Sequence, residues 1–259
     1  MLNYAVKQSD GPMVDLQASV SKGWLNKNGG YKFESQYYLD PLFRHEQDKA
    51  INDFLKNRLP DYPIYNMEDN LMQAKFMASN QVIVGGLQPN LILGMILGSE
   101  PLFPEDKDSD IVGKPLENIT SADELPSTDS ILNSDLIKKI DLQIQTIQKT
   151  HYELNPIPPF FWDLSGRATI HGIVTTSHKL VGENIFMMMV TDPGLVHAIH
   201  SWITEAYIKL INHFSEFCSL KTTSIHIGEC SGPMLSPAFF DEFVDRKSTR
   251  LNSSHVALS

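Results

Sequence analysis

Apolar residues recur at helical spacing in the clearest stretches of the chain. One stripe follows Pro193 and predicts a long helix capped by Thr191 or Asp192. Two shorter stripes predict amphipathic helices over 41–59 and 134–150. The stripe after Pro193 consists of Val196, Ile199, Ile203, Tyr207, Leu210, Ile211 and Phe214.

Short apolar or β-branched runs between these helices predict strands. The predicted strands cover 81–84, 157–162, 184–190 and 222–228, with a weaker one near Leu102. Further helices are predicted over 91–97, over 166–181 and from Ser236 onward. This alternation is typical of parallel βα units, which a doubly wound sheet and a (β/α)₈ barrel both contain. Gly85-Gly86 lacks the glycine spacing of a dinucleotide fingerprint, so the barrel is favoured.

Composition narrows the classes of protein that fit. The 259 residues include 31 acidic and 21 basic side chains, a formal net charge of -10, which argues against a nucleic-acid-binding surface. The apolar runs are far shorter than the roughly 20 residues that cross a bilayer, and the first ten residues have no apolar signal core. Two cysteines supply neither a disulfide scaffold nor a complete metal cluster. We therefore expect a cytoplasmic protein that binds neither nucleic acid nor a membrane.

The sequence at the end of the chain indicates a segment that is not native to the protein. Residues 245–255 read DRKSTRLNSSH, which matches the in-frame translation of a common sequencing-library adapter. The expected organisation is an N-terminal arm or cap over 1–40, a partial barrel domain over 41–244, and an adapter-derived tail over 245–259. Removing Asp245 and the three basic residues of the tail leaves 18 basic and 30 acidic residues, a net charge of -12. The remaining arginines are Arg44, Arg58 and Arg167.

Polar side chains cluster where the last predicted strand ends. His226, Glu229 and Cys230 bring an imidazole, a carboxylate and a thiol to the edge at which parallel α/β folds bind ligands. They would serve as a general acid/base pair or as part of a soft metal site. One histidine and one cysteine do not complete a zinc site, and a packed histidine with a small buried thiol is the plainer alternative.

Other candidates follow the earlier strands. Asp163 and Arg167 would bind a substrate carboxylate or form a charge pair at a helix start. His171 and His178 share one face of the helix predicted over 166–181, where a packing role is favoured. The assigned roles are catalytic for Glu229, His226 and Asp163, substrate-binding for Arg167, Gly85 and Gly86, and metal-binding for Cys230 and His226.

The segment from Ser236 to Phe243, SPAFFDEF, resembles the uroporphyrinogen decarboxylase superfamily. The segment 85–98 and the Asp192-Pro193 helix start are similar to the same family, so the resemblance covers about 40–244. It implies a distorted (β/α)₈ barrel with its cleft at the carboxyl ends of the strands. Family members include cofactor-free decarboxylases of tetrapyrrole acetate groups. Others are zinc-dependent methyltransferases that move a methyl group between a corrinoid protein and a thiol.

Departures from the family favour one of these reactions but leave both open. The arginine-rich N-terminal segment and early aspartate of the true decarboxylases are missing, and a polycarboxylate needs cationic partners. The His-x-Cys zinc motif of the methyltransferases would fall beyond Val244, so His226 and Cys230 are not equated with it. Charge favours the corrinoid-linked methyltransferase, with zinc, over the carboxy-lyase, which needs no cofactor. The resemblance implies that the protein binds a small-molecule substrate such as a tetrapyrrole, or else a corrinoid protein. It also implies a second copy of the chain in a homodimer. A non-enzymatic barrel subunit that binds a carrier or partner protein is the alternative.

Overall fold

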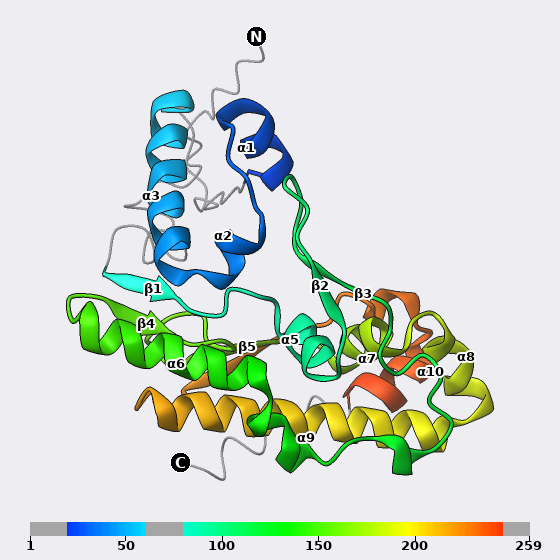
Figure 1. Ribbon diagram of the computed structural model, residues 1–259. Coiled ribbons are helices and arrows are strands. Elements are labelled where there is room, and N and C mark those ends of the chain that lie inside the picture. The colour runs from blue at the N-terminus through cyan, green and yellow to red at the C-terminus, as the bar shows by residue number, and fades with distance from the viewer. Residues whose placement is uncertain (1–19, 61–79, 246–259) are drawn as a thin grey trace, which may run out of the picture.

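The computed structural model describes residues 20–60 and 80–245 (Figure 1). It is a mixed α/β structure, mostly helical, with small parallel sheets. No helix in this described part is long and apolar enough to cross a membrane. Residues 1–19 of the predicted arm and 246–259 of the predicted tail lie outside the described residues.

Residues 20–60 form a group of helices. These are α1 (Lys22–Gly29), α2 (Ser35–Leu39) and α3 (Pro41–Arg58). The predicted helix over 41–59 is confirmed: Asp40 accepts hydrogen bonds from the N–H groups of Leu42 and Phe43, both at 3.1 Å, and Pro41 opens the helix. The described part of the predicted arm, which reads as turn-rich, instead contains α1 and α2.

Two pairs of parallel strands form the centre. They are β1 (Gln81–Ile83) with β4 (Asn155–Ile157), and β5 (Arg167–His171) with β6 (Ser224–Gly228). The chain beyond β4 turns back along β5, where the N–H of Thr169 donates to the carbonyl of Phe160 at 2.8 Å. Phe160 makes this turn with a positive φ of 68°. The described strands do not close into a barrel.

An antiparallel hairpin joins this centre to the N-terminal helices. It consists of β2 (Glu100–Leu102) and β3 (Asp110–Val112), so the weak strand predicted near Leu102 is confirmed. Figure 1 shows the hairpin reaching toward α1. Tyr38 of α2 stacks on Phe103 with ring centroids 5.4 Å apart, and its hydroxyl accepts a hydrogen bond from the N–H of Ser109.

Six helices pack around the strands and supply most of the core. They are α5 (Pro89–Ile96), α6 (Asp135–Thr150), α7 (Ile173–Val181), α8 (Asn184–Thr191), α9 (Pro193–Phe217) and α10 (Pro237–Phe240). Every residue of the predicted stripe on α9 is fully buried, and the carboxylate of Asp192 caps the helix by accepting from the N–H of Leu195. Figure 1 shows α6 and α9 running below the strands. His213 and Asp141 join these two helices at 2.9 Å.

The short elements complete the chain. Three 3₁₀ turns are η1 (Ala122–Glu124), η2 (Thr128–Asn133) and η3 (Gly232–Met234), and a π-helical turn, η4 (Asp241–Asp245), follows α10. The helix predicted to start at Ser236 is confirmed, because the hydroxyl of Ser236 caps α10. Phe243 of η4 is fully buried, with its ring stacked 4.9 Å from that of His197 on α9.

Three predicted elements are wrong. The strand predicted over 157–162 is a turn for most of its length, because β4 ends at Ile157. The segment 184–190 is the helix α8 and not a strand, because its buried residues Ile185, Met188 and Met189 fall at helical spacing. The segment 166–181 is not one helix, because β5 occupies its first part and Gly172 separates it from α7. His171 therefore lies on a strand, and it does not share a helix face with His178.

The buried guanidinium of Arg44 fixes the N-terminal helices to the end of β1. Its Nη1 donates to the carbonyl of Gly86 at 3.1 Å, and its Nε lies 3.4 Å from Asp48. The group also lies 4.9 Å from the ring centroid of Tyr37, whose hydroxyl donates to Asp48 at 2.8 Å. One cation thus joins α2, α3 and the Gly85-Gly86 turn.

Replacing Arg44 with methionine should lower the free energy of unfolding by about 3 kcal/mol, because it leaves Asp48 partly buried without its cation. Urea denaturation followed by circular dichroism measures the change. Arg58→Met is the matched control, since Arg58 is exposed at the end of the same helix, and we expect a change of less than about 0.5 kcal/mol there. Equal effects of the two substitutions would contradict a structural role for Arg44.

Candidate functional site

The carboxyl ends of β5 and β6 lie side by side and define the candidate site. The register pairs His171 with Gly228, and the N–H of Gly172 donates to the carbonyl of Gly228 at 2.9 Å. The prediction that Glu229 and Cys230 directly follow a strand is confirmed, because β6 ends at Gly228, whereas His226 lies within β6.

Glu229 caps helix α7 from outside that helix. Its carboxylate accepts hydrogen bonds from the N–H of Val174 at 3.1 Å and from the N–H of Thr175 at 2.8 Å. The hydroxyl of Thr175 donates to the same carboxylate and accepts from the N–H of Ser231 at 2.9 Å. The negative charge lies at the positive end of the helix dipole, where it is stabilised.

Gly172 makes this arrangement possible. It occupies the N-cap position of α7 and has no side chain to cap the helix itself. A Cβ atom at this position would lie 2.0 Å from Oε2 of Glu229, so no larger residue fits without moving the carboxylate. Because three donors already engage the carboxylate, Glu229 is placed to position the strand end rather than to take a proton from a ligand.

His171 is the group at this edge that sequence reasoning assigned to packing. Its side chain is largely buried, and its Nδ1 atom has no hydrogen-bond partner among the described residues. Burial, and to a lesser degree the charge of Lys179, lowers the pKa of His171. A neutral imidazole with an unsatisfied ring nitrogen is suited to bind a polar ligand or to accept a proton. The unsatisfied atom depends on packing between distant segments, so no sequence signal identifies it.

His226 lies further than His171 from the carboxyl ends of the paired strands β5 and β6. It pairs with Thr169, its side chain is exposed, and its ring meets that of Trp162 edge-on with centroids 5.5 Å apart. Of the two thiols, Cys230 is exposed beside Glu229, whereas burial raises the pKa of Cys218 to about 11. Cys230 is therefore the more accessible thiol in the described part of the chain.

The remaining candidates do not converge with Glu229. Arg167 is the first residue of β5, so it lies four residues, roughly 13 Å, from the carboxyl end of the strand. Its guanidinium lies 5.0 Å from the ring centroid of Trp162. Asp163 lies in the turn before β5, where it accepts from the N–H of Ser165 at 2.7 Å. Trp162 thus packs against both Arg167 and His226, and the roles assigned to Arg167 and Asp163 stay predictions.

Protein atoms already surround Gly85 and Gly86, the two glycines with a predicted substrate-binding role. Gly85 adopts a φ of +57°, and a Cβ there would lie 2.8 Å from the ring of Pro159. A Cβ on Gly86 would lie 1.8 Å from the guanidinium of Arg44. A tight turn packed against the protein accounts for both glycines, and their substrate-binding role stays a prediction.

The described residues do not form a complete zinc site. No group of three or more histidine, cysteine, aspartate or glutamate side chains within them could hold a metal ion. His226 packs against Trp162 and Glu229 caps α7, so these two side chains do not join Cys230 around one point. We accordingly assign no chemical step to a metal at these residues.

The comparisons with known proteins add no relative. No protein-family model matches the chain, and a search of curated proteins finds no match. The resemblance to the uroporphyrinogen decarboxylase superfamily therefore depends on the short motifs described above.

Glu229→Gln should lower the free energy of unfolding by about 1–2 kcal/mol, because the amide offers one acceptor oxygen where the carboxylate offers two. Urea denaturation of the variant, beside Glu216→Gln on the exposed face of α9, provides the measurement. A variant as stable as the unmodified protein would show that the cap contributes little.

Stability should decrease as the pH falls from about 7 to 5, in part through two histidines. Burial lowers the pKa of both His171 and His45, so below about pH 6.5 the unfolded chain binds their protons more tightly than the folded chain. The contribution of each histidine to the free energy of unfolding is complete above about pH 6.5. It is lost as the pH falls through the lowered pKa of the folded state. Replacing either residue with glutamine should reduce the slope of unfolding free energy against pH, measured by urea denaturation at several pH values. Parallel curves for the variants and the unmodified protein would contradict this assignment.

Proposed function

We propose that the chain belongs to a uroporphyrinogen-decarboxylase-like enzyme, a (β/α)₈ barrel that binds a small-molecule substrate at the carboxyl ends of its parallel strands. The observation that carries the proposal is His171 at the carboxyl end of β5, whose buried Nδ1 atom has no hydrogen-bond partner among residues 20–60 and 80–245. In parallel α/β folds this edge is where ligands bind. The parallel β5–β6 pair, with helices α7 and α9 after its first strand, is consistent with one sector of such a barrel.

The positions of the arginines favour methyl transfer over decarboxylation of a polycarboxylate. Arg44 is buried against Asp48 and Gly86, and Arg58 is exposed at the far end of α3. Arg167 lies at the amino end of β5 and stacks on Trp162. None of the three native arginines lies at the carboxyl end of the β5–β6 pair, so a substrate with many carboxylates would find few cationic partners there.

A neutral imidazole suits the transfer of a methyl group to a thiol. When a methyl group passes from a corrinoid cobalt to the sulfur of a thiol, the thiol loses its proton. His171 is kept neutral by burial and is placed to accept that proton. Glu229 contributes by holding the loop 229–231 against α7, which positions the strand ends rather than reacting.

A non-enzymatic barrel subunit that binds a carrier protein is the second candidate. The engagement of Glu229 in the cap of α7 favours it, because the carboxylate predicted to be catalytic is occupied by three protein donors. Assays of turnover separate the two candidates.

The protein should transfer the methyl group of methylcobalamin to a small thiol faster than the uncatalysed reaction, while it should not convert uroporphyrinogen. The absorbance change of the cobalamin and chromatography of the porphyrins measure the two reactions. His171→Asn should reduce methyl transfer by about a hundredfold, since general-base catalysis supplies that order of rate. His151→Asn, near the end of α6 and remote from the strand ends, is the control and should leave the rate unchanged. Absence of both reactions in the folded protein would reject the enzyme and favour the carrier-binding subunit.

A further inference from the structure

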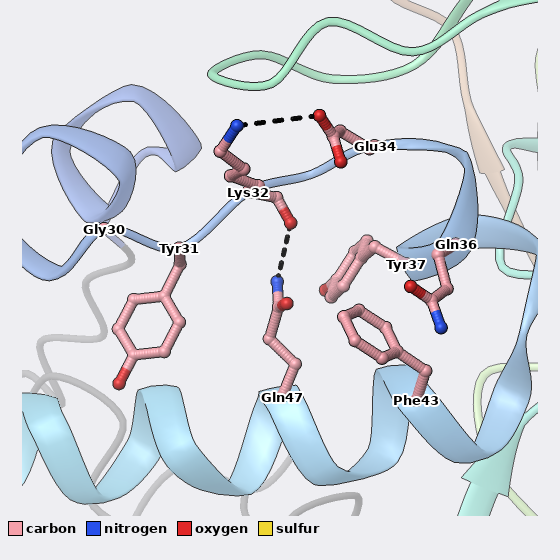
Figure 2. A pocket seen from close by; sticks show the side chains of 8 residues that line it. All are labelled: Gly30, Tyr31, Lys32, Glu34, Gln36, Tyr37, Phe43 and Gln47. Carbon is pink, nitrogen blue, oxygen red and sulfur yellow. Dashed lines mark hydrogen bonds and ion pairs between the residues drawn. The ribbon is translucent and has the colours of Figure 1, made fainter.

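A pocket and a cluster of side chains lie outside the candidate site in the described part of the chain. The pocket, of about 270 Å³, opens between α3 and the segment that joins α1 to α2 (Figure 2). Its polar groups bind one another, because Gln47 donates to the carbonyl of Lys32 at 2.9 Å and the ammonium group of Lys32 lies 3.8 Å from Glu34. The cluster, at the amino ends of β5 and β6, contains cations that form no ion pair among residues 20–60 and 80–245. It therefore has the greater capacity to bind a partner.

The amino-end cluster consists of Trp162, Leu164, Arg167 and Lys221. The first two lie in the turn before β5, the third is the first residue of β5, and the fourth lies three residues before β6. Trp162 is half-buried, and the other three residues are exposed. Because β5 and β6 are parallel, their amino ends share one edge, and the candidate site lies at the opposite edge. A partner at this cluster would leave the candidate site uncovered.

Hydrogen bonds join the two turns that carry the cluster. The N–H of Thr223 donates to the carbonyl of Gly166 at 2.9 Å, and the hydroxyl of Thr223 donates to the carbonyl of Ser165 at 3.0 Å. Gly166 has a φ of +83°, and a side chain there would collide with the carbonyl of Lys221. Glycine thus lets the turn before β5 lie against the turn before β6, which brings the members of the cluster to one rim.

The ring of Trp162 is held in place by the protein itself. Its backbone N–H donates to the carbonyl of Arg167 at 2.9 Å, and the guanidinium of Arg167 lies 5.0 Å from the ring centroid. The ring of His226 meets it edge-on, with centroids 5.5 Å apart. A ring fixed in this way loses little conformational entropy when a partner covers it. Tryptophan and arginine are also the residue types that contribute most to binding at protein interfaces. The cluster therefore has the composition of a preformed interface.

Charge indicates the kind of partner. Within the described residues no carboxylate forms an ion pair with Arg167 or Lys221, and Asp163 in the same turn accepts from the N–H of Ser165 at 2.7 Å. A guanidinium stacked on an aromatic face keeps the donors at its edge for a carboxylate. Two copies of a chain with a formal net charge of -10 repel each other, which disfavours a second copy as the partner. The cluster is complementary to an acidic segment of another protein.

The small number of cations favours a peptide over a nucleic acid. A protein that holds a nucleic acid neutralises about six to ten phosphates, far more than this cluster can reach. Trp162 and Leu164 offer apolar surface as well, and a peptide can supply an aliphatic side chain for it. We propose that the amino-end cluster binds an acidic segment of a partner protein, with carboxylates on Arg167 and Lys221 and an aliphatic side chain against Trp162. The proposal goes beyond the function proposed for the strand ends and does not depend on it.

Two hexapeptides of opposite charge test the proposal. Glu-Glu-Leu-Glu-Glu-Leu, titrated into the full chain and followed by NMR chemical shifts, should shift the indole N–H of Trp162 with a dissociation constant of about 1 mM. Lys-Lys-Leu-Lys-Lys-Leu should bind at least about tenfold more weakly. Equal affinities would overturn the proposal, because they would show apolar contact without recognition of charge. Absence of binding of the acidic peptide up to about 20 mM, or tighter binding of a thymidine hexanucleotide, would overturn it as well.

Variants of the cluster, each with a matched control, test the assigned residues. Trp162→Leu should weaken binding of the acidic peptide about tenfold, whereas Trp24→Leu, at a half-buried ring in α1, should leave it unchanged. Arg167→Gln should weaken binding about fivefold, whereas Arg58→Gln, at an exposed guanidinium at the end of α3, should not. Circular dichroism verifies that each variant is folded. Lys221→Gln, at an exposed side chain outside the strands, repeats the test if Trp162→Leu does not fold. Unchanged affinity in the folded cluster variants, or equal losses in the controls, would reject the site.

Discussion

The carboxylate of Glu229 joins three parts of the chain at the candidate site. It binds the first turn of α7 through the N–H groups of Val174 and Thr175, and it lies directly after β6. The absence of a side chain at Gly172 lets the carboxylate approach the helix, and Gly172 also continues the ladder between β5 and β6. The position of His171 at the strand end follows from this contact, because His171 immediately precedes Gly172.

The same contact changes the interpretation of the site. A charged residue after a strand suggests catalysis when only the sequence is known, yet here the charge stabilises a helix that cannot cap itself. Among the described residues at this edge, His171 keeps a buried ring nitrogen without a hydrogen-bond partner, and Cys230 presents an exposed thiol after β6. In the function we propose, the charged Glu229 positions the strand end, and the neutral imidazole of His171 is the group left to meet a ligand.

Long amphipathic elements could be predicted from the sequence, whereas short apolar ones could not. The stripe on α9 spans about five turns, so its period is unambiguous, and the cap at Asp192 marks the start of the helix. The run 184–190 is too short to show a period, and its three methionines suit a helix as well as a core strand. The position of Glu229 and Cys230 after a strand was also predictable. The cap on α7 was not, because its donors lie more than fifty residues earlier in the chain.

The turn at Phe160 shows how aromatic packing can determine a backbone path. A bulky residue with a positive φ is disfavoured by about 1–2 kcal/mol, and glycine would adopt the same conformation freely. The ring of Phe160, however, is buried, with its centroid 5.9 Å from that of Tyr207 and 6.1 Å from that of Phe214, both on α9. Glycine would relax the turn and leave a void beside α9. The reversal from β4 to β5 is therefore stabilised by packing against a helix that begins about thirty residues later in the chain.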